Sequence, residues 1–282
     1  MRKLFFIFIL IDLCVSQEIP ELKLSLARNG HSVTTLQEYN LVFFAGGRTE
    51  LYTTHETIDV LNITSFSWDV IKLSLGRTEI GSTSLNNHGL VFFAGGQYFT
   101  KDTNSVVYIP IVHITNIIDI YDVKNKMFKT AYLSVNRSSI SATSLEKEGL
   151  VFFAGGRTHV KYNFAGFENI YSNIIDIYDA NQCIWSTAQL SFPNAFITGV
   201  SFNSLGLFIA GGGLGTTLDI YNSSSKIWTK YTITSQRIIG TSISLEKFGI
   251  IFIAGGALMT DVSISIDLVE IIDVVNKKTT LN

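Results

Sequence analysis

Leu41-Val-Phe-Phe-Ala-Gly-Gly47 is the stretch that decides the fold, because close copies of it return along the chain. The copies are Leu90–Gly96, Leu150–Gly156, a shortened Leu207–Gly212, and Ile250–Gly256. A short apolar run that ends at paired glycines is typical of a buried strand followed by a tight turn. Recurrence at intervals of roughly 40 to 60 residues indicates a repeat architecture.

Three further phrases recur with the glycine phrase and define one repeating unit. Downstream stands an apolar phrase with a central Asp: Ile58–Leu61, Ile118–Tyr121, Ile175–Tyr178, Leu218–Tyr221 and Ile272–Val275. Seven positions later follows an aromatic residue: Trp68, Phe128, Trp185 and Trp228. Upstream lies an element that starts at Arg28, Arg77, Arg137, Asn194 and Arg237, and the segment after each aromatic alternates polar and apolar residues. Each unit therefore reads as four short strands, which is the composition of a β-propeller blade.

The pairing of Gly-Gly with a later Tyr and Trp resembles the signature of the kelch family. Tyr178 with Trp185 and Tyr221 with Trp228 match both aromatic positions, whereas Leu61 with Trp68 and Tyr121 with Phe128 each depart at one. The resemblance implies an all-β, kelch-type β-propeller with five four-stranded blades. It implies no particular function, because kelch propellers serve many unrelated purposes.

The two ends of the chain predict how the ring closes. The fifth unit stops at Asn282, where its Trp would stand, so we expect it to lack a fourth strand. Glu21–Leu26 is similar to Val70–Leu75 and is predicted to supply that strand, which removes open sheet edges. The protein is then expected to be a monomer. Kelch propellers more often have six or seven blades, so an incomplete chain or closure by a dimer stays open.

The N-terminus predicts secretion. Arg2 and Lys3 precede the apolar run Leu4–Ile11, and small residues stand before Gln17, which is typical of a signal peptide over residues 1–16 followed by one domain over 17–282. An uncleaved signal-anchor is the alternative, but the apolar run is far shorter than the ~20 residues that span a bilayer. The sequence predicts no later span. Candidate glycosylation sites are Asn62, Asn136 and Asn222.

Composition narrows the class of partner. Hydrophobic residues make up 46% of the chain and charged residues 16%, with a formal net charge of −2. Such a chain can bury a large core and has no basic field for nucleic acid. We expect a protein or glycan partner and no nucleic acid.

Binding residues are expected where the repeat is broken, in the long insertions 97–116 and 157–173. Aromatic residues there could stack against a sugar or peptide, and nearby arginines could contact carboxylates or carbonyls. The candidates are Arg48, Arg77, Tyr98, Phe99, Tyr108, Arg137, Arg157, Tyr162, Phe167 and Tyr171. The alternative is that the recurring arginines are structural and that the insertions pack on themselves.

The sequence predicts a non-catalytic binding module without cofactor or metal. The five histidines share no repeat position, and the repeated Asp series keeps the repeat symmetry that a catalytic pair would break. The alternative is an extracellular carbohydrate-active enzyme, an oxidase or glycosidase, with Glu79 as the main carboxylate candidate. A cytoplasmic scaffold with a misread leader is a third possibility.

Overall fold

The computed structural model describes residues 22–281, apart from 51, 102–109, 164–165, 196, 212, 214, 235–240, 258–264, 266, 275 and 277. The side chains of 160–163, 166–168, 198, 241 and 278–281 also lie outside the description. The expected signal peptide, residues 1–16, falls outside the described residues. Within the described ones, secondary structure consists of strands and three short 3-10 helices, which confirms the all-β prediction. No helix in these ranges is long and apolar enough to cross a membrane.

Among the described residues, five four-stranded antiparallel sheets form the body of the protein. Sheet one contains β1 (Ser32–Leu36), β2 (Leu41–Ala45), β3 (Thr57–Asn62) and β4 (Ser67–Lys72). Sheet two contains β5 (Gly81–Leu85), β6 (Leu90–Ala94), β9 (Ile117–Asp122) and β10 (Met127–Tyr132). Sheet three contains β11 (Ser141–Leu145), β12 (Leu150–Ala154), β15 (Ile174–Asp179) and β16 (Ile184–Gln189). Sheet four contains β17 (Thr198–Phe202), β18 (Leu207–Gly211), β19 (Thr217–Asn222) and β20 (Ile227–Thr232). Sheet five contains β21 (Thr241–Leu245), β22 (Ile250–Ala254), β23 (Val269–Asp273) and β24 (Lys278–Leu281).

Smaller elements decorate these sheets. Two separate β-hairpins consist of β7 (Gln97–Lys101) with β8 (Pro110–Ile114) and of β13 (Arg157–Asn163) with β14 (Gly166–Tyr171). The 3-10 helices η1 (Gln37–Tyr39), η2 (Asn86–His88) and η3 (Glu246–Phe248) connect the first two strands of sheets one, two and five.

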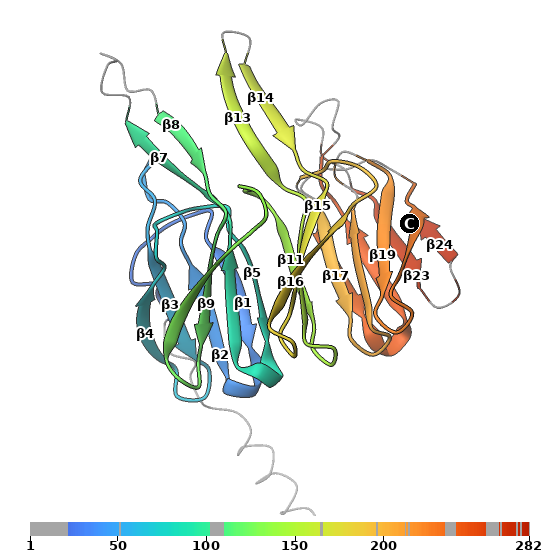
Figure 1. The fold of residues 1–282 in the computed structure, drawn as a ribbon, viewed down its shortest axis with the longest axis horizontal. Coiled ribbons are helices and arrows are strands. Elements are labelled where there is room, and N and C mark those ends of the chain that lie inside the picture. The colour runs from blue at the N-terminus through green and yellow to red at the C-terminus, as the bar shows by residue number, and fades with distance from the viewer. Residues whose placement is uncertain are drawn as a thin grey trace, which may run out of the picture.

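The sheets follow one another in chain order, with sheet one on the left and sheet five on the right of Figure 1. The first strands β1, β5, β11, β17 and β21 contact one another in this order. A hydrophobic cluster fills the space between each sheet and the next. Aromatic contacts such as Phe43 with Phe93, at 6.3 Å between ring centroids, cross these interfaces. Burial between neighbouring sheets is therefore what holds the body together.

The repeated phrases take the strand positions that the sequence predicts. The glycine phrase forms the second strand of each sheet, and its glycines follow in left-handed conformation, such as Gly95 at φ 62° and Gly96 at φ 101°. A Cβ on Gly95 would lie 2.2 Å from the carbonyl oxygen of Arg137. Glycine is required there both by the backbone conformation and by the close approach of the next connection.

The predicted closing strand is wrong. Residues 22–28 form no strand, and β24 supplies the fourth strand of sheet five. In β24, Thr279 lies opposite Ile272, at the position where Trp228 lies opposite Tyr221 in sheet four. The aromatic residue is thus not needed for a fourth strand, because backbone pairing alone forms the ladder.

The predicted alignment of the fifth unit is also wrong. β22 pairs Ile253 with Glu270, as β2 pairs Phe44 with Asp59, so Glu270 and not Asp273 takes the repeated acidic position. The backbone N–H of Thr234 donates to Glu270 at 2.9 Å, just as that of Ser74 donates to Asp119 at 3.2 Å. Asp273 instead occupies the strand end, where it accepts a hydrogen bond from the N–H of Asn276 at 2.8 Å.

Candidate functional site

The recurring arginines form buried ion pairs with the recurring aspartates. Arg28 pairs with Asp59 at 2.7 Å and Arg77 pairs with Asp119 at 2.8 Å, and both partners of each pair are almost fully buried. Burial lowers the pKa of Arg77, and the Asp119 carboxylate partly opposes that shift. The guanidinium stays charged at any ordinary pH, so each pair is ionic.

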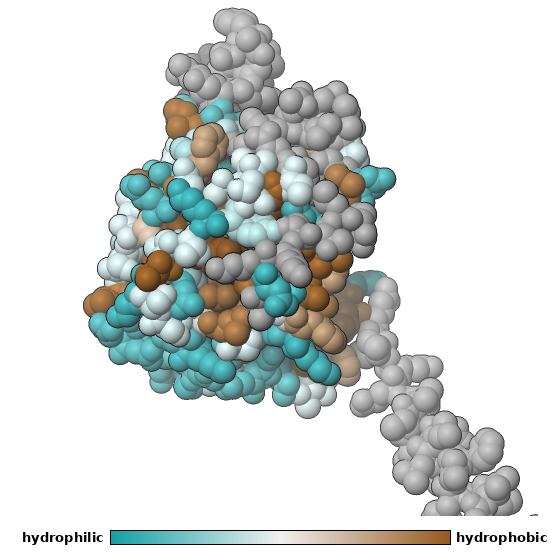
Figure 2. All heavy atoms as spheres, turned by 90° about the vertical axis from the view of Figure 1, so that its right-hand side faces the viewer, coloured by the Kyte–Doolittle hydropathy of each residue, from teal (hydrophilic) through white to brown (hydrophobic). Residues whose placement is uncertain are grey.

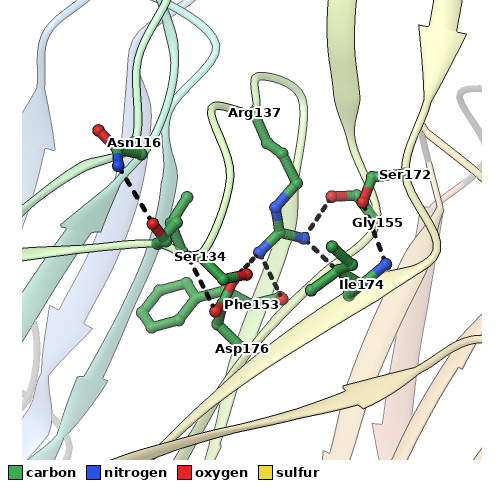
Figure 3. Close-up of polar contacts among 9 residues, drawn as sticks. Asn116, Ser134, Arg137, Phe153, Gly155, Ser172, Ile174 and Asp176 are labelled. Atoms are coloured by element: carbon green, nitrogen blue, oxygen red, sulfur yellow. Dashed lines mark hydrogen bonds and ion pairs between the residues drawn. The ribbon is translucent and has the colours of Figure 1, made fainter.

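Arg137 makes the most extensive contacts of this series (Figure 3). Its Nη1 donates to the carbonyl oxygens of Gly155 at 2.6 Å and Ile174 at 2.7 Å, and its Nη2 donates to the carboxylate of Asp176. Asp176 also accepts the backbone N–H of Ser134 at 3.0 Å. The side chain therefore ties the connection that enters sheet three to two of its strands.

Arg77 and Arg137, two of the predicted ligand contacts, are fully buried. Neither side chain reaches the surface. Each guanidinium donates hydrogen bonds to at least one backbone carbonyl oxygen and to one carboxylate. The structural alternative describes them better. In sheet four, Asn194 replaces the arginine, and the carboxylate of Asp219 is held by the N–H and hydroxyl of Ser191 at 2.8 and 2.5 Å.

The other candidates gather around the two hairpins, which stand beyond the sheets at the top of Figure 1. The insertions 97–116 and 157–173 contain the hairpins β7–β8 and β13–β14. The first hairpin follows the second strand of sheet two, and the second hairpin follows the second strand of sheet three. Strands β8 and β13 contact one another. The two insertions thus form one surface, which we call the hairpin face.

Aromatic and cationic side chains of the first hairpin pack in pairs. Tyr98 stacks on His113 with ring centroids 4.8 Å apart and planes at 16°. Phe99 contacts Tyr52 edge-on at 5.1 Å, and the guanidinium of Arg48 lies 6.0 Å from the Phe99 ring centroid. All of these side chains are partly exposed. Because Tyr98 and Phe99 are neighbours on β7, the two aromatic pairs lie on opposite faces of the hairpin, and the positive charge of Arg48 lies beside the Phe99 pair.

The second hairpin is described mainly through its backbone. Tyr162 pairs with Phe167 across β13 and β14, and their side chains lie outside the description. Tyr171 packs against Ala257. The predicted contact Tyr108 lies outside the described residues. Only part of the predicted aromatic set can therefore be placed on the hairpin face.

A polar cluster at the base of both hairpins joins them to each other. The Glu79 carboxylate accepts hydrogen bonds from Gln97 Nε2 at 2.9 Å and Ser139 Oγ at 2.5 Å and forms an ion pair with Arg157. Glu79 and Ser139 both have positive φ, at 57° and 53°, and the Ser139 N–H donates to the Glu79 carbonyl at 3.0 Å. Arg157, the first residue of β13, therefore links the second hairpin through Glu79 to Gln97 of the first hairpin.

Gln97 and Ser139 were missed by the sequence-based selection. Gln97 is buried at the first position of β7, and Ser139 stands two residues after the repeated arginine, where Glu79 stands in the preceding unit. The shared offset from Arg77 and Arg137 could have indicated Ser139, and Gln97 directly follows its glycine pair, as Arg48 and Arg157 do in their units.

The glycosylation candidates lie in turns and connections. Asn62 ends β3, at the strand end opposite the one that leads to the hairpin face, and its Oδ1 accepts the N–H groups of Thr64 and Ser65 at 2.9 and 3.1 Å. Asn222 does the same in sheet four. Asn136 is exposed in the connection before β11.

A cleft of about 390 Å³ opens between sheets four and five, beside Asn222. Its walls include Ile220 and Tyr231 from sheet four and Ile272 from sheet five. Ile272 stands where sheets two to four carry Tyr121, Tyr178 and Tyr221, so a smaller side chain faces this interface.

No protein-family model matches the chain, and no curated protein is detectably similar to it. The resemblance to the kelch family therefore stays a prediction from the sequence motifs.

Proposed function

We propose that the chain is built from kelch-like repeats, acts as a secreted binding module and recognises a protein or glycan through the hairpin face. The observation that carries this proposal is the pairing of partly exposed aromatic rings at the first hairpin, Tyr98 with His113 on one of its faces and Phe99 with Tyr52 of the β2–β3 connection on the other. Flat aromatic surfaces with an adjacent cation suit sugar rings and peptide groups.

Backbone contacts hold the bases of both hairpins in place. Backbone bridges between Thr78 and Gln97 and between Ser138 and Arg157 fix both hairpins to the connections that enter sheets two and three. The ion pair between Arg157 and Glu79 then couples the two hairpins. A preorganised face loses less conformational entropy on binding.

Secretion is supported by the leader-like residues 1–16 and by the sequons. Glycans on Asn62 or Asn222 would leave the hairpin face free, because those residues end their strands at the opposite edge of the sheets.

The enzymatic alternative has weaker support. Glycosidases use a pair of carboxylates, and the polar partners of the Glu79 carboxylate are Gln97, Ser139 and Arg157, none of which is a carboxylate.

The test is binding of purified protein to a glycan array and a peptide array, followed by titration of the best hit. We expect Tyr98→Ala and Phe99→Ala each to weaken binding at least tenfold, about 1.4 kcal/mol. The matched control is Phe248→Ala, since Phe248 is 64% exposed on η3, at the strand ends opposite those that lead to the hairpins. Equal affinity of all three variants, or turnover of a sugar by the protein, would refute the proposal.

A further inference from the structure

The second strands of the sheets reveal that the two end sheets each leave one apolar face uncovered. In β6, β12 and β18 every residue after the first is buried, so both faces of these strands are covered. In β2, by contrast, Val42 and Phe44 are partly exposed while Phe43 is buried. In β22 the pattern alternates in the opposite phase, with Phe252 partly exposed between buried neighbours. Because alternate side chains point to opposite faces, each end sheet buries a single face.

Two kinds of face meet in every interface between neighbouring sheets. We call the face that carries Phe43 face A and the opposite face, which carries Phe44, face B; the other sheets are assigned by strand register. Face A of each sheet packs on face B of the next, as in the contacts Phe43–Phe93, Phe92–Phe153 and Phe152–Phe208 at 6.3, 6.2 and 4.2 Å. Between sheets four and five, Ile209 of face A clusters with Ile251 and Ile253 of face B.

The faces left over are of opposite kinds. Sheet one exposes its face B and sheet five exposes its face A, and this is the combination that packs in all four internal interfaces. A head-to-tail contact between these end faces would therefore continue the internal packing pattern.

Exposure at matched positions shows how much apolar surface is uncovered. The last residue of the first strand lies on face A and is fully buried as Leu36, Leu85, Leu145 and Phe202, but its counterpart Leu245 in sheet five is 40% exposed. Ile243 on the same face is 60% exposed, and on face B of sheet one Val33 and Val70 are each 50% exposed. Figure 2 shows the end of the molecule that carries sheet five, with hydrophobic side chains gathered in the middle and hydrophilic ones below. Contiguous apolar surface of this kind marks an interaction site.

Two features favour a second copy over contact between both ends of one chain. Sheets one and five lie at opposite ends of the longest axis (Figure 1). The second feature is the size of one side chain on face B of the first strand. Sheet one carries Val33 at this position, where sheets two, three and four carry the smaller Ser82, Ala142 and Gly199. Gly199 lies so close to sheet three that a Cβ would approach Ser141 Oγ to 2.2 Å. Val33 therefore does not fit the close spacing of the internal sheets, so a second copy would pair the same two kinds of face at a wider spacing.

We infer that the protein associates with a second copy of itself, head to tail, with face A of sheet five in one copy packed on face B of sheet one in the other. This departs from the monomer that the sequence predicts. The interface is heterologous, so each copy offers two different surfaces and both must be intact for an assembly of identical chains.

The test uses the full chain and single lysine substitutions at exposed positions of each face. Val33→Lys and Ile243→Lys should each reduce the wild-type assembly to monomer mass in light scattering coupled to gel filtration. A mixture of the two variants should form a 1:1 dimer and nothing larger, because one intact face A and one intact face B remain to pair. Met127→Lys is the control, since Met127 is 61% exposed on β10 and lies on neither end face.

Dimer formation in the mixture also proves that both variants are folded. A wild-type chain that stays monomeric at its highest soluble concentration would overturn the inference. So would a wild-type assembly that survives either substitution, or a mixture that yields monomers only.

Discussion

Arg137 and Asp176 are 39 residues apart in the chain and form an ion pair inside sheet three, with both side chains almost fully buried. Three backbone carbonyls accept further hydrogen bonds from the same guanidinium, so the charge is compensated although it lies away from water. A buried charge that loses its partner has no such compensation.

Arg137→Met should lower the free energy of unfolding by about 3 to 5 kcal/mol, because it leaves the Asp176 carboxylate buried and unpaired. Denaturation in urea, followed by tryptophan fluorescence, measures the change. The double variant Arg137→Met/Asp176→Asn should recover part of the loss, since the neutral side chain still accepts the Ser134 N–H. A single variant within about 1 kcal/mol of wild type would contradict the prediction.

Gly95→Ala should destabilise the protein by about 3 kcal/mol or more, because Gly95 has φ 62° and an added Cβ would meet the Arg137 carbonyl oxygen at 2.2 Å. Gly215→Ala is the matched control. A Cβ at Gly215 would find its nearest neighbours at 3.9 Å, so its thermal midpoint should stay close to wild type. Equal midpoints for the two variants would show that the close approach does not matter.

Sequence patterns predicted the sheets well because their signals are local. A few consecutive residues are enough to indicate a buried or alternating strand and a turn that requires glycine, as in Leu90–Gly96. The same holds for the second strand of every sheet.

Relations between distant segments were predicted less well. Asp273 copies the Ile-Asp phrase locally, but its register is set by pairing with β22, and a shift by three residues turns each side chain to the other face. The insertions have no counterpart within the repeat, so their folding into hairpins was not evident. Closure by residues 21–26 depended on a contact between sheets one and five, which no local pattern determines.

Asn62→Asp should leave stability unchanged while removing the sequon. Asp122 and Asp179 already accept the same turn N–H groups in sheets two and three, so a carboxylate serves this turn as well as an amide does. Asn62→Ala should cost about 1 kcal/mol, because two N–H groups lose their acceptor. Intact mass of protein secreted from a eukaryotic host, before and after glycosidase treatment, shows whether Asn62 carries a glycan. Thr64→Val removes the sequon without removing the acceptor, and a stability loss there equal to that of Asn62→Ala would contradict the turn role.

Glu146 and Glu246 make equivalent contacts between sheets but should respond to pH with opposite signs. Burial raises the pKa of Glu146, although the N–H and Nδ2 of Asn86 donate to its carboxylate at 2.8 Å each. Burial also acts to raise the pKa of Glu246, but hydrogen bonds from Asn203 and Ser204 outweigh it and the pKa falls below its ordinary value. The folded state thus favours the protonated form of Glu146 and the ionised form of Glu246.

The stabilisation from Glu246 is present above the unfolded-state pKa of about 4.3 and is lost as pH falls through the folded-state value. That from Glu146 is present below about pH 4.3 and is lost as pH rises through its folded-state value. The cost of Glu246→Gln should therefore shrink from about pH 7 to about pH 3, while that of Glu146→Gln should grow over the same range, each by less than about 1 kcal/mol since both side chains are partly exposed. Urea denaturation of both variants and wild type at these two pH values decides the matter, and parallel pH profiles for the two variants would rule out opposite shifts.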